Sequence, residues 1–270
     1  MERRHFIFSL SGACACGMFG CRADAASPDA NLDFCTELAL DATESAKWWQ
    51  SEWETPPQND DEAASLVAKQ WKKTRKVLNV DFLNDHGNPK LKDRVIEAAR
   101  GWEDHMGLTF SFGAAEPDIL VSFQPGKGHW SYVGTDSLAK SRAGEPSMNF
   151  GWEAAPFAER EVRRVSLHEF GHALSLIHEH QHPDAGIPWD RNAVLEYYRR
   201  TQGWDDAKIE RNIFVKYSKS QVNRTRYDTD SIMHYAIPGA LLTDPAYATS
   251  WNTRLSSLDE GMAEYLFPKV

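Results

Sequence analysis

The feature of this 270-residue sequence that most restricts its fold is His168-Glu169-Phe170-Gly171-His172, inside a segment with helical spacing. Two histidines four residues apart lie on one side of an α-helix, so both imidazoles can bind one metal ion. Neutral imidazole nitrogen suits zinc at about 2.0–2.1 Å. Glu169 lies roughly a quarter of a turn round the helix, where it reaches a water beside the metal and can act as a general base. Taken alone, the pattern also fits a solvent-facing helix that carries two histidines by chance.

A third histidine narrows this choice. His178 follows His172 by six residues, which gives the spacing His-Glu-x-x-His-x-x-x-x-x-His. A sharp turn after the helix would bring the third ring to the same metal. Three protein ligands leave one position for water, which is the arrangement of a catalytic zinc site and not of a structural one. We therefore predict one Zn²⁺ per chain. His180 and His182 are competing third ligands, although the spacing favours His178.

The segment Ser231-Ile232-Met233-His234-Tyr235 lies far downstream and has the form of a methionine turn. It would make an apolar floor beneath the three histidines, in which Met233 is not itself a ligand. A lone Met-His-Tyr sequence is more often ordinary core. Its combination with the histidine spacing favours the methionine turn.

With these motifs, residues 67–270 resemble the astacin-like metzincin peptidases, particularly the bacterial and fungal branch of that family. Glu179 follows the third histidine directly, and this residue separates astacins from most other metzincins. Further segments resemble the cleft-edge strand, the strand before the active-site helix, and the C-terminal helix and close of the family. These are Trp130-Ser131-Tyr132-Val133-Gly134, Ser147-Met148-Asn149-Phe150-Gly151, and Leu255-Ser256-Ser257-Leu258-Asp259 with Phe267-Pro268.

The resemblance implies a metalloendopeptidase that hydrolyses internal peptide bonds, with zinc and Glu169 activating a water. An extended protein or peptide substrate would pair with the edge strand near Trp130 to Gly134. Tyr235 is implied as a switchable extra zinc ligand that hydrogen-bonds the developing oxyanion, and Glu179 as a structural acceptor near the zinc. The implied fold is α+β, of the metzincin type: a mixed twisted sheet, an active-site helix, a second backing helix and an irregular C-terminal subdomain.

Several positions depart from the family pattern. Ser175 stands where the family usually has glycine, at the point where the helix must end and the chain turn toward His178. If this position needs a positive φ, serine costs on the order of 1 kcal/mol. The disulfide cysteines of animal astacins are absent, so the core has to rely on packing. His180-Gln181-His182-Pro183 replaces the arginine-rich stretch that often follows the third histidine.

Two rival functions use the same residues differently. A thermolysin-like peptidase would keep His168 and His172 and take Glu196, on a later helix, as its third ligand. This leaves His178 and the Met233 segment without a role. A catalytically degenerate, zinc-binding interaction domain is the non-enzymatic alternative, encouraged slightly by Ser175, although every ligand and the general base are present.

The N-terminus has the character of an export signal. Arg3 and Arg4 precede an apolar run, and Ala23-Asp24-Ala25 offers a cleavage site, so residues 1–25 are expected to be a signal peptide. We expect an exported protein, periplasmic or extracellular, without a transmembrane segment. A lipid anchor at Cys21 is the weaker alternative to a soluble form. Residues 26–66 are polar and irregular and are interpreted as an N-terminal extension or propeptide, which leaves residues 67–270 as the catalytic domain.

Cys35 is the only cysteine beyond the expected leader, so an internal disulfide is excluded. The simpler interpretation is a buried thiol in the extension. The sharper hypothesis is a latency switch, in which the thiolate occupies the open position on zinc until the extension is removed.

The formal net charge of −9 argues against nucleic acid as a partner. The short basic cluster from Lys72 to Lys76 is better explained as a solvated face, and no oxygen-rich loop indicates calcium. Apolar spacing predicts strands at 76–83, 108–112, 119–123, 130–134 and 147–150. It predicts helices at 88–106, 157–174, 192–200 and 257–266. This order of elements also indicates an α+β domain.

Overall fold

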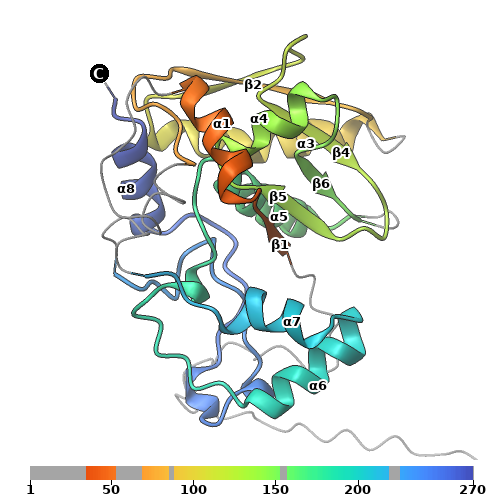
Figure 1. Cartoon of the computed structure of the whole chain (residues 1–270), viewed down its shortest axis with the longest axis vertical. Helices are drawn as coiled ribbons and strands as arrows, with labels where there is room; N and C mark the ends of the chain where they lie inside the picture. The colour runs from red at the N-terminus through yellow and green to blue at the C-terminus, as the bar shows by residue number, and fades with distance from the viewer. Residues whose placement is uncertain (1–34, 53–68, 85–87, 153–156, 219–225, 270) are drawn as a thin grey trace, which may run out of the picture.

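The computed structural model describes residues 35–52, 69–84, 88–152, 157–218 and 226–269 (Figure 1). The expected leader with Arg3, Arg4 and Cys21 lies outside these residues, as does the stretch 53–68 that joins the extension to the domain. Among the helices within the described ranges, none combines the length and the apolar character that a membrane crossing requires.

Six strands form one mixed sheet in the order β1-β5-β6-β4-β2-β3. β5 runs antiparallel to β6, and the other neighbouring pairs are parallel. The strands are β1 Cys35–Leu38, β2 Val77–Phe82, β3 Thr109–Phe112, β4 Ile119–Phe123, β5 His129–Tyr132 and β6 Met148–Phe150. β4 is buried at all five positions, as expected for a strand that is covered on both faces.

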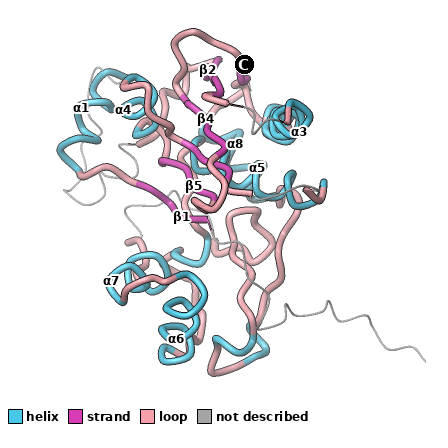
Figure 2. The backbone as a smooth tube through the Cα atoms, turned by 90° about the vertical axis from the view of Figure 1, so that its right-hand side faces the viewer, coloured by secondary structure: helices cyan, strands magenta, loops and turns pink. Residues whose placement is uncertain are grey.

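Helices cover both faces of this sheet. α3 and α5 pack against each other on one face, and α1 and α4 lie together on the other (Figure 2). α6 and α7 belong to the less regular second half of the molecule (Figure 1). The helices are α1 Ala42–Glu52, α3 Pro89–Arg100, α4 Asp136–Arg142, α5 Glu159–Ala173, α6 Arg191–Gln202, α7 Asp206–Ile209 and α8 Ser257–Leu266.

Most elements lie where the apolar spacing predicts them, and two do not. The N-terminal extension is expected to be irregular, yet it contains β1 and α1. That prediction is wrong because β1 is held by backbone pairing with β5, which does not depend on an apolar side-chain pattern. The seven-residue helix α4 is also absent from the predicted elements, since two turns are too short to establish a period.

The predicted helix at 88–106 ends early. Pro89 begins α3, where its missing N–H has no cost, but the helix stops at Arg100 and a short 3₁₀ turn, Glu103–His105, follows. Trp102 and Met106 are buried nonetheless. Apolar spacing therefore identified the core positions and misplaced the helix end, because a 3₁₀ turn also presents residues at intervals of about three.

The described residues form two hydrophobic clusters. The larger lies among the sheet, α3 and α5 and includes Met233; the smaller lies in the second half, around α6, and includes Cys35 and Tyr235. Met233 and Tyr235 are two positions apart in the sequence and belong to different clusters. The segment that holds both therefore lies where the two clusters meet.

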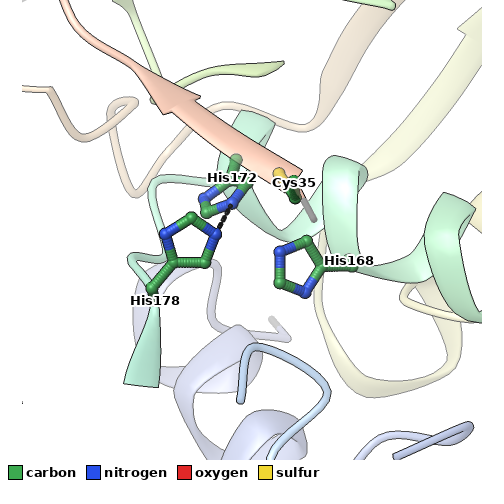
Figure 3. Close-up of side chains that lie close together, drawn as sticks. All are labelled: Cys35, His168, His172 and His178. Carbon is green, nitrogen blue, oxygen red and sulfur yellow. Dashed lines mark hydrogen bonds between the residues drawn. The ribbon is translucent and has the colours of Figure 1, made fainter. Parts of the chain in front are cut away.

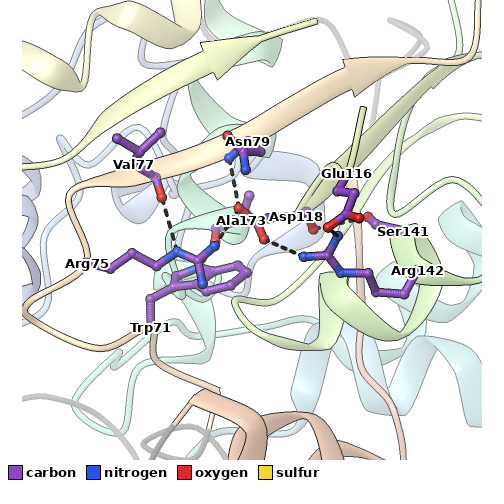
Figure 4. A network of polar contacts seen from close by, with 9 residues as sticks. All are labelled: Trp71, Arg75, Val77, Asn79, Glu116, Asp118, Ser141, Arg142 and Ala173. Carbon is purple, nitrogen blue, oxygen red and sulfur yellow. Dashed lines mark hydrogen bonds and ion pairs between the residues drawn. The ribbon is translucent and has the colours of Figure 1, made fainter. Parts of the chain in front are cut away.

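A buried carboxylate joins three parts of the first half (Figure 4). Asp118, immediately before β4, is fully buried and lies 2.6 Å from Arg75 Nη2 and 3.3 Å from Arg142 Nη2. It also accepts from the backbone N–H of Asn79 in β2 at 2.8 Å. Two guanidinium groups and one amide thus satisfy a charge that could not otherwise remain buried.

We expect Asp118→Ala to lower the free energy of unfolding by about 3 kcal/mol, because it leaves two arginines and a buried amide without their acceptor. Urea unfolding measured by tryptophan fluorescence checks this. Glu116→Ala is the matched control, since Glu116 contacts Arg142 at 3.8 Å from an exposed position and should contribute little. Equal effects of the two substitutions would contradict the prediction.

Candidate metal centre

α5 carries His168, Glu169 and His172 on its buried side. His168 Nδ1 lies 2.8 Å from the carbonyl oxygen of Ile232, and His172 Nδ1 lies 2.9 Å from that of Leu176. A carbonyl oxygen can only accept, so each Nδ1 holds the ring proton and each Nε2 presents a lone pair. The two rings thus come to the site in the tautomer and orientation of metal ligands (Figure 3).

The end of α5 is a tight reversal that directs the chain back to the site. Leu176 N donates to Gly171 O at 3.0 Å and Ser175 N to His172 O at 2.8 Å, which is the hydrogen-bond pattern of a Schellman motif. The motif needs one left-handed residue, and Ser175 has a φ of 80°. Its hydroxyl also donates to the carbonyl oxygen of Lys69 at 2.9 Å, a bond that glycine could not make.

The reversal brings in the third histidine. His178 Nε2 lies 3.1 Å from His172 Nε2, and its ring centroid is 5.2 Å from that of His168. The side chain of Gln181 hydrogen-bonds to His178 and is itself held by the carbonyls of Arg211 and Val215. Sequence reasoning missed Gln181. Its position three residues after the ligand, in a 3₁₀ turn, is the only signal for it.

Burial sets the protonation of the groups at the site. It lowers the pKa values of His168 and His178 well below the usual value, and the neighbouring histidines lower them further. Both rings are therefore neutral at pH 7, the form that binds metal. Burial also raises the pKa of Glu169 to about 8, opposed by the hydrogen bond from Cys35. A divalent cation beside Glu169 would favour the carboxylate again.

The methionine segment packs directly beneath α5. A Cβ built on Gly171 would lie 2.4 Å from Met233 Sδ, so only glycine admits this side chain here. Asp259 holds the segment in place, since its carboxylate accepts from Ser231 Oγ at 2.7 Å and from Ile232 N at 2.8 Å. The residue that orients His168 through its carbonyl, Ile232, is thus fixed by a bond from α8.

Glu179 links the turn of the third ligand to this floor. Its backbone N–H donates to Met233 O at 3.1 Å, and its Oε1 accepts from the backbone N–H of Asp228 at 2.8 Å. Burial raises the pKa of the Glu179 carboxyl to about 8. The side chain lies where a structural acceptor is expected and outside the group that could hold a metal among the described residues.

Tyr235 lies against the histidines from the side of the second cluster. Its ring centroid is 4.5 Å from that of His178 and 4.4 Å from that of His180. Its hydroxyl donates to the backbone carbonyl oxygen of Cys35. In this structure the extension therefore engages the hydroxyl that the family resemblance assigns to zinc and to the oxyanion.

Cys35 completes the cluster. One ligand atom each from Cys35, His168, His172 and His178 lie within 4.8 Å of one another, and all four residues are buried (Figure 3). Cys35 Sγ is 3.1 Å from Glu169 Oε2. The sequence placed this cysteine 133 positions before the first histidine, 168 − 35, with no pattern that brings them together.

The three imidazoles fit a zinc ion. Two nitrogens on one tetrahedral zinc at about 2.0–2.1 Å are about 3.3 Å apart, close to the 3.1 Å between the Nε2 atoms of His172 and His178. His168 Nε2 and Glu169 Oε1 are buried and have no hydrogen-bond partner within the described part of the chain. An ion at the centre of the rings would satisfy that nitrogen, and a water beside the ion would satisfy the carboxylate oxygen.

The competing ligands lie elsewhere. His180 Nε2 is 2.8 Å from the carbonyl oxygen of Asn212, and His182 Nδ1 accepts from the backbone N–H of Asp184. Glu196 is exposed on α6. None of the three belongs to the cluster of ligand atoms, so the described residues do not form a thermolysin-like ligand set.

The model of one family of peptidases, Astacin, matches residues 64–246. The chain belongs to the astacin family. The match covers 183 residues, 246 − 64 + 1, and includes the three histidines, Glu169 and the methionine segment. The α+β fold expected from the sequence is thereby confirmed as the astacin type of metzincin fold.

Solved structures support the same assignment. The chain is 36% identical to one structure of myroilysin, with a TM-score of 0.70 over 76% of this chain and 98% of the other. A second myroilysin structure is 31% identical, with a TM-score of 0.60 over 90% and 94% of the two chains. High choriolytic enzyme 1 of Oryzias latipes, at 16% identity and a TM-score of 0.53, shares the fold and covers 74% of this chain and 94% of that one.

Curated relatives match over a shorter stretch. Tolloid-like protein 1 of Mus musculus is 30% identical over 142 residues, 52% of this chain. Zinc metalloproteinase nas-23 of Caenorhabditis elegans is 27% identical over 169 residues, 60% of this chain. The chain spans only 12% and 27% of the lengths of these two relatives.

Substitutions at Ser175 test the strain in the reversal. Ser175→Ala keeps the left-handed backbone and loses the bond to Lys69, so we expect the free energy of unfolding to fall by about 1 kcal/mol. Ser175→Gly loses the same bond but removes a strain of about 1 kcal/mol, so it should be more stable than the alanine variant. Urea unfolding of the three proteins decides, and an alanine variant more stable than the glycine variant would contradict the prediction.

Proposed function

We propose that this chain is a zinc-dependent endopeptidase that hydrolyses internal peptide bonds of extended protein or peptide substrates. The observation that carries the proposal is the convergence of His168, His172 and His178 beside Glu169, in the neutral form that binds zinc. We further propose one zinc ion per chain. Zinc when bound would lower the pKa of a water and polarise the scissile carbonyl.

Glu169 acts as the general base. Its carboxylate lies one residue after the first ligand on α5, with one oxygen buried and available. It takes a proton from the attacking water and later passes it to the leaving amine. Tyr235, packed against His178, donates its hydroxyl proton in a hydrogen bond to the developing oxyanion once the carbonyl of Cys35 has left it.

The substrate lies along β5. This strand borders α5, and the side of β5 away from β6 offers backbone groups to an extended chain. Backbone pairing positions any sequence, and pockets for side chains supply the selectivity. We propose that residues 67–270 form the catalytic domain and that residues 26–66 are a propeptide. On the leader sequence, we also propose export to the periplasm or the exterior.

A catalytically degenerate binding domain is the alternative that activity measurements separate. Such a domain would bind zinc through the same histidines and turn over no substrate. Nothing at the site favours it, because the general base and all three ligands are present and oriented.

Replacement of Glu169 tests the mechanism. We expect Glu169→Ala to retain zinc and to lose cleavage of casein by about 10²–10⁴-fold, the range that positioned general bases contribute. Zinc content by atomic emission and turnover on casein measure the two properties. A chelator should abolish the activity of the unaltered protein, and zinc should restore it. Turnover near that of the unaltered protein in the zinc-loaded Glu169→Ala variant would overturn the assigned role.

Paired histidine substitutions test the ligand set. His178→Ala should lower zinc affinity strongly, because two imidazoles remain, whereas His180→Ala should keep the full zinc content. Competition with a chromophoric chelator gives the affinity of each variant. His180 is a suitable control because it is buried close to the site and its ring nitrogen is bonded to Asn212 instead of to the cluster. Loss of zinc from the His180 variant alone would replace the proposed third ligand.

A further inference from the structure

The edge of the sheet that a substrate would need is already covered by the chain itself. β1 lies along β5 in parallel register, from Cys35 opposite His129 to Leu38 opposite Tyr132 (Figure 1). The backbone N–H of Val133 continues the contact by donating to Leu38 O at 3.2 Å. An extended substrate cannot pair with these backbone groups while β1 holds them.

The thiol of the same strand lies at the metal centre. Cys35 Sγ is within 4.8 Å of the ligand nitrogens of all three histidines, and Figure 3 shows it above the rings. Three imidazoles and one thiolate make a four-coordinate N₃S set, the closed arrangement of a structural zinc site. The pocket that remains between Cys35, His168, Glu169 and Trp251 has a volume of about 10 Å³, which is room for about one water.

Two further contacts fix the strand at this position. The carbonyl of Cys35 accepts the hydroxyl of Tyr235, so the extension also occupies the proposed oxyanion donor. Beyond β1, the backbone N–H of Leu40 donates to Asp136 Oδ2 at 2.9 Å. Asp136 is buried and forms an ion pair of 2.9 Å with Lys69, the first described residue of the domain. The extension therefore contacts the metal centre, the oxyanion donor and the substrate edge at once.

We propose that Cys35 is the fourth ligand of the zinc in the unprocessed chain, and that residues 35–52 thereby keep the site closed as an intramolecular inhibitor. The inference rests on the proposed peptidase function only for its second half. Binding of sulfur as thiolate releases the thiol proton and takes the position that the attacking water needs. Activation is then a change of ligand, which follows once the chain is cut between the extension and the domain.

Cobalt tests the ligand directly. The full chain loaded with Co²⁺ in place of zinc should show a thiolate-to-cobalt charge-transfer band in the near ultraviolet, together with the visible bands of tetrahedral cobalt. Cys35→Ser should lose the charge-transfer band and keep the visible bands, which also show that the variant is folded and holds the metal. Thr36→Ser, one residue along β1, is the matched control and should keep both. Visible bands without the charge-transfer band in the unaltered chain would overturn the proposal.

Serine at this position also separates sulfur ligation from simple occupation of the cleft, because its hydroxyl can still donate to Glu169. We expect uncut, zinc-loaded Cys35→Ser to cleave casein at least about tenfold faster than the uncut unaltered chain, since turnover follows the fraction of molecules with an open site. An uncut serine variant as latent as the unaltered chain would mean that sulfur is not the lock.

The two failures are distinguishable. A charge-transfer band in a chain that never gains activity, even after removal of the extension, supports the ligand and sinks the peptidase. An active protein without the band sinks the ligand and leaves the peptidase standing.

Discussion

The whole site depends on three buried imidazoles that each need a hydrogen-bond acceptor behind them. His168 finds it in the carbonyl of Ile232, His172 in that of Leu176, and His178 in the side chain of Gln181. A buried ring nitrogen without such a partner costs about 1–3 kcal/mol and is free to turn away from the metal. The three partners come from three different segments. The metal centre is therefore specified by the packing of both halves of the molecule and not by α5 alone.

This dependence explains residues that bind nothing. Gly171 sits between the two ligands of α5 because a side chain there would collide with Met233, and Met233 has to lie close for the neighbouring Ile232 carbonyl to reach His168. Asp259 in turn holds Ser231 and Ile232 from the N-terminal turn of α8. The C-terminal helix thus acts on the orientation of a ligand without contact to the metal.

The parts of the site that the sequence predicts are those governed by local geometry. Helix geometry places residues four apart on one side, so His168 and His172 could be paired without a structure. The turn to His178 could be predicted in outline, and the positive φ of Ser175 agrees with the expected strain. Gln181 could not be predicted, because its role depends on carbonyls of Arg211 and Val215, which are 30 and 34 positions away.

β1 was out of reach for a different reason. A strand that binds through its backbone needs no apolar alternation, and four residues with Thr36 and Glu37 among them carry none. Sequence analysis could state the latency hypothesis for Cys35 only as chemistry, since a thiolate is a good zinc ligand wherever it arrives. What brings it to the three histidines is the register of β1 on β5.

An exposed sheet edge is a liability, because its unpaired backbone groups accept any extended chain. A substrate-binding edge cannot be blunted permanently by charge or proline without losing its use, so it has to be covered reversibly. β1 meets that requirement, but a four-residue parallel pairing is a weak hold, slightly weaker per residue than an antiparallel one. The weak pairing therefore has to be supplemented by contacts that a substrate cannot imitate. Here these are the sulfur of Cys35 at the histidines and the bond from Leu40 to the Lys69–Asp136 pair. Because each contact is modest and all are on one short segment, separation of that segment from the domain is enough to lose them together.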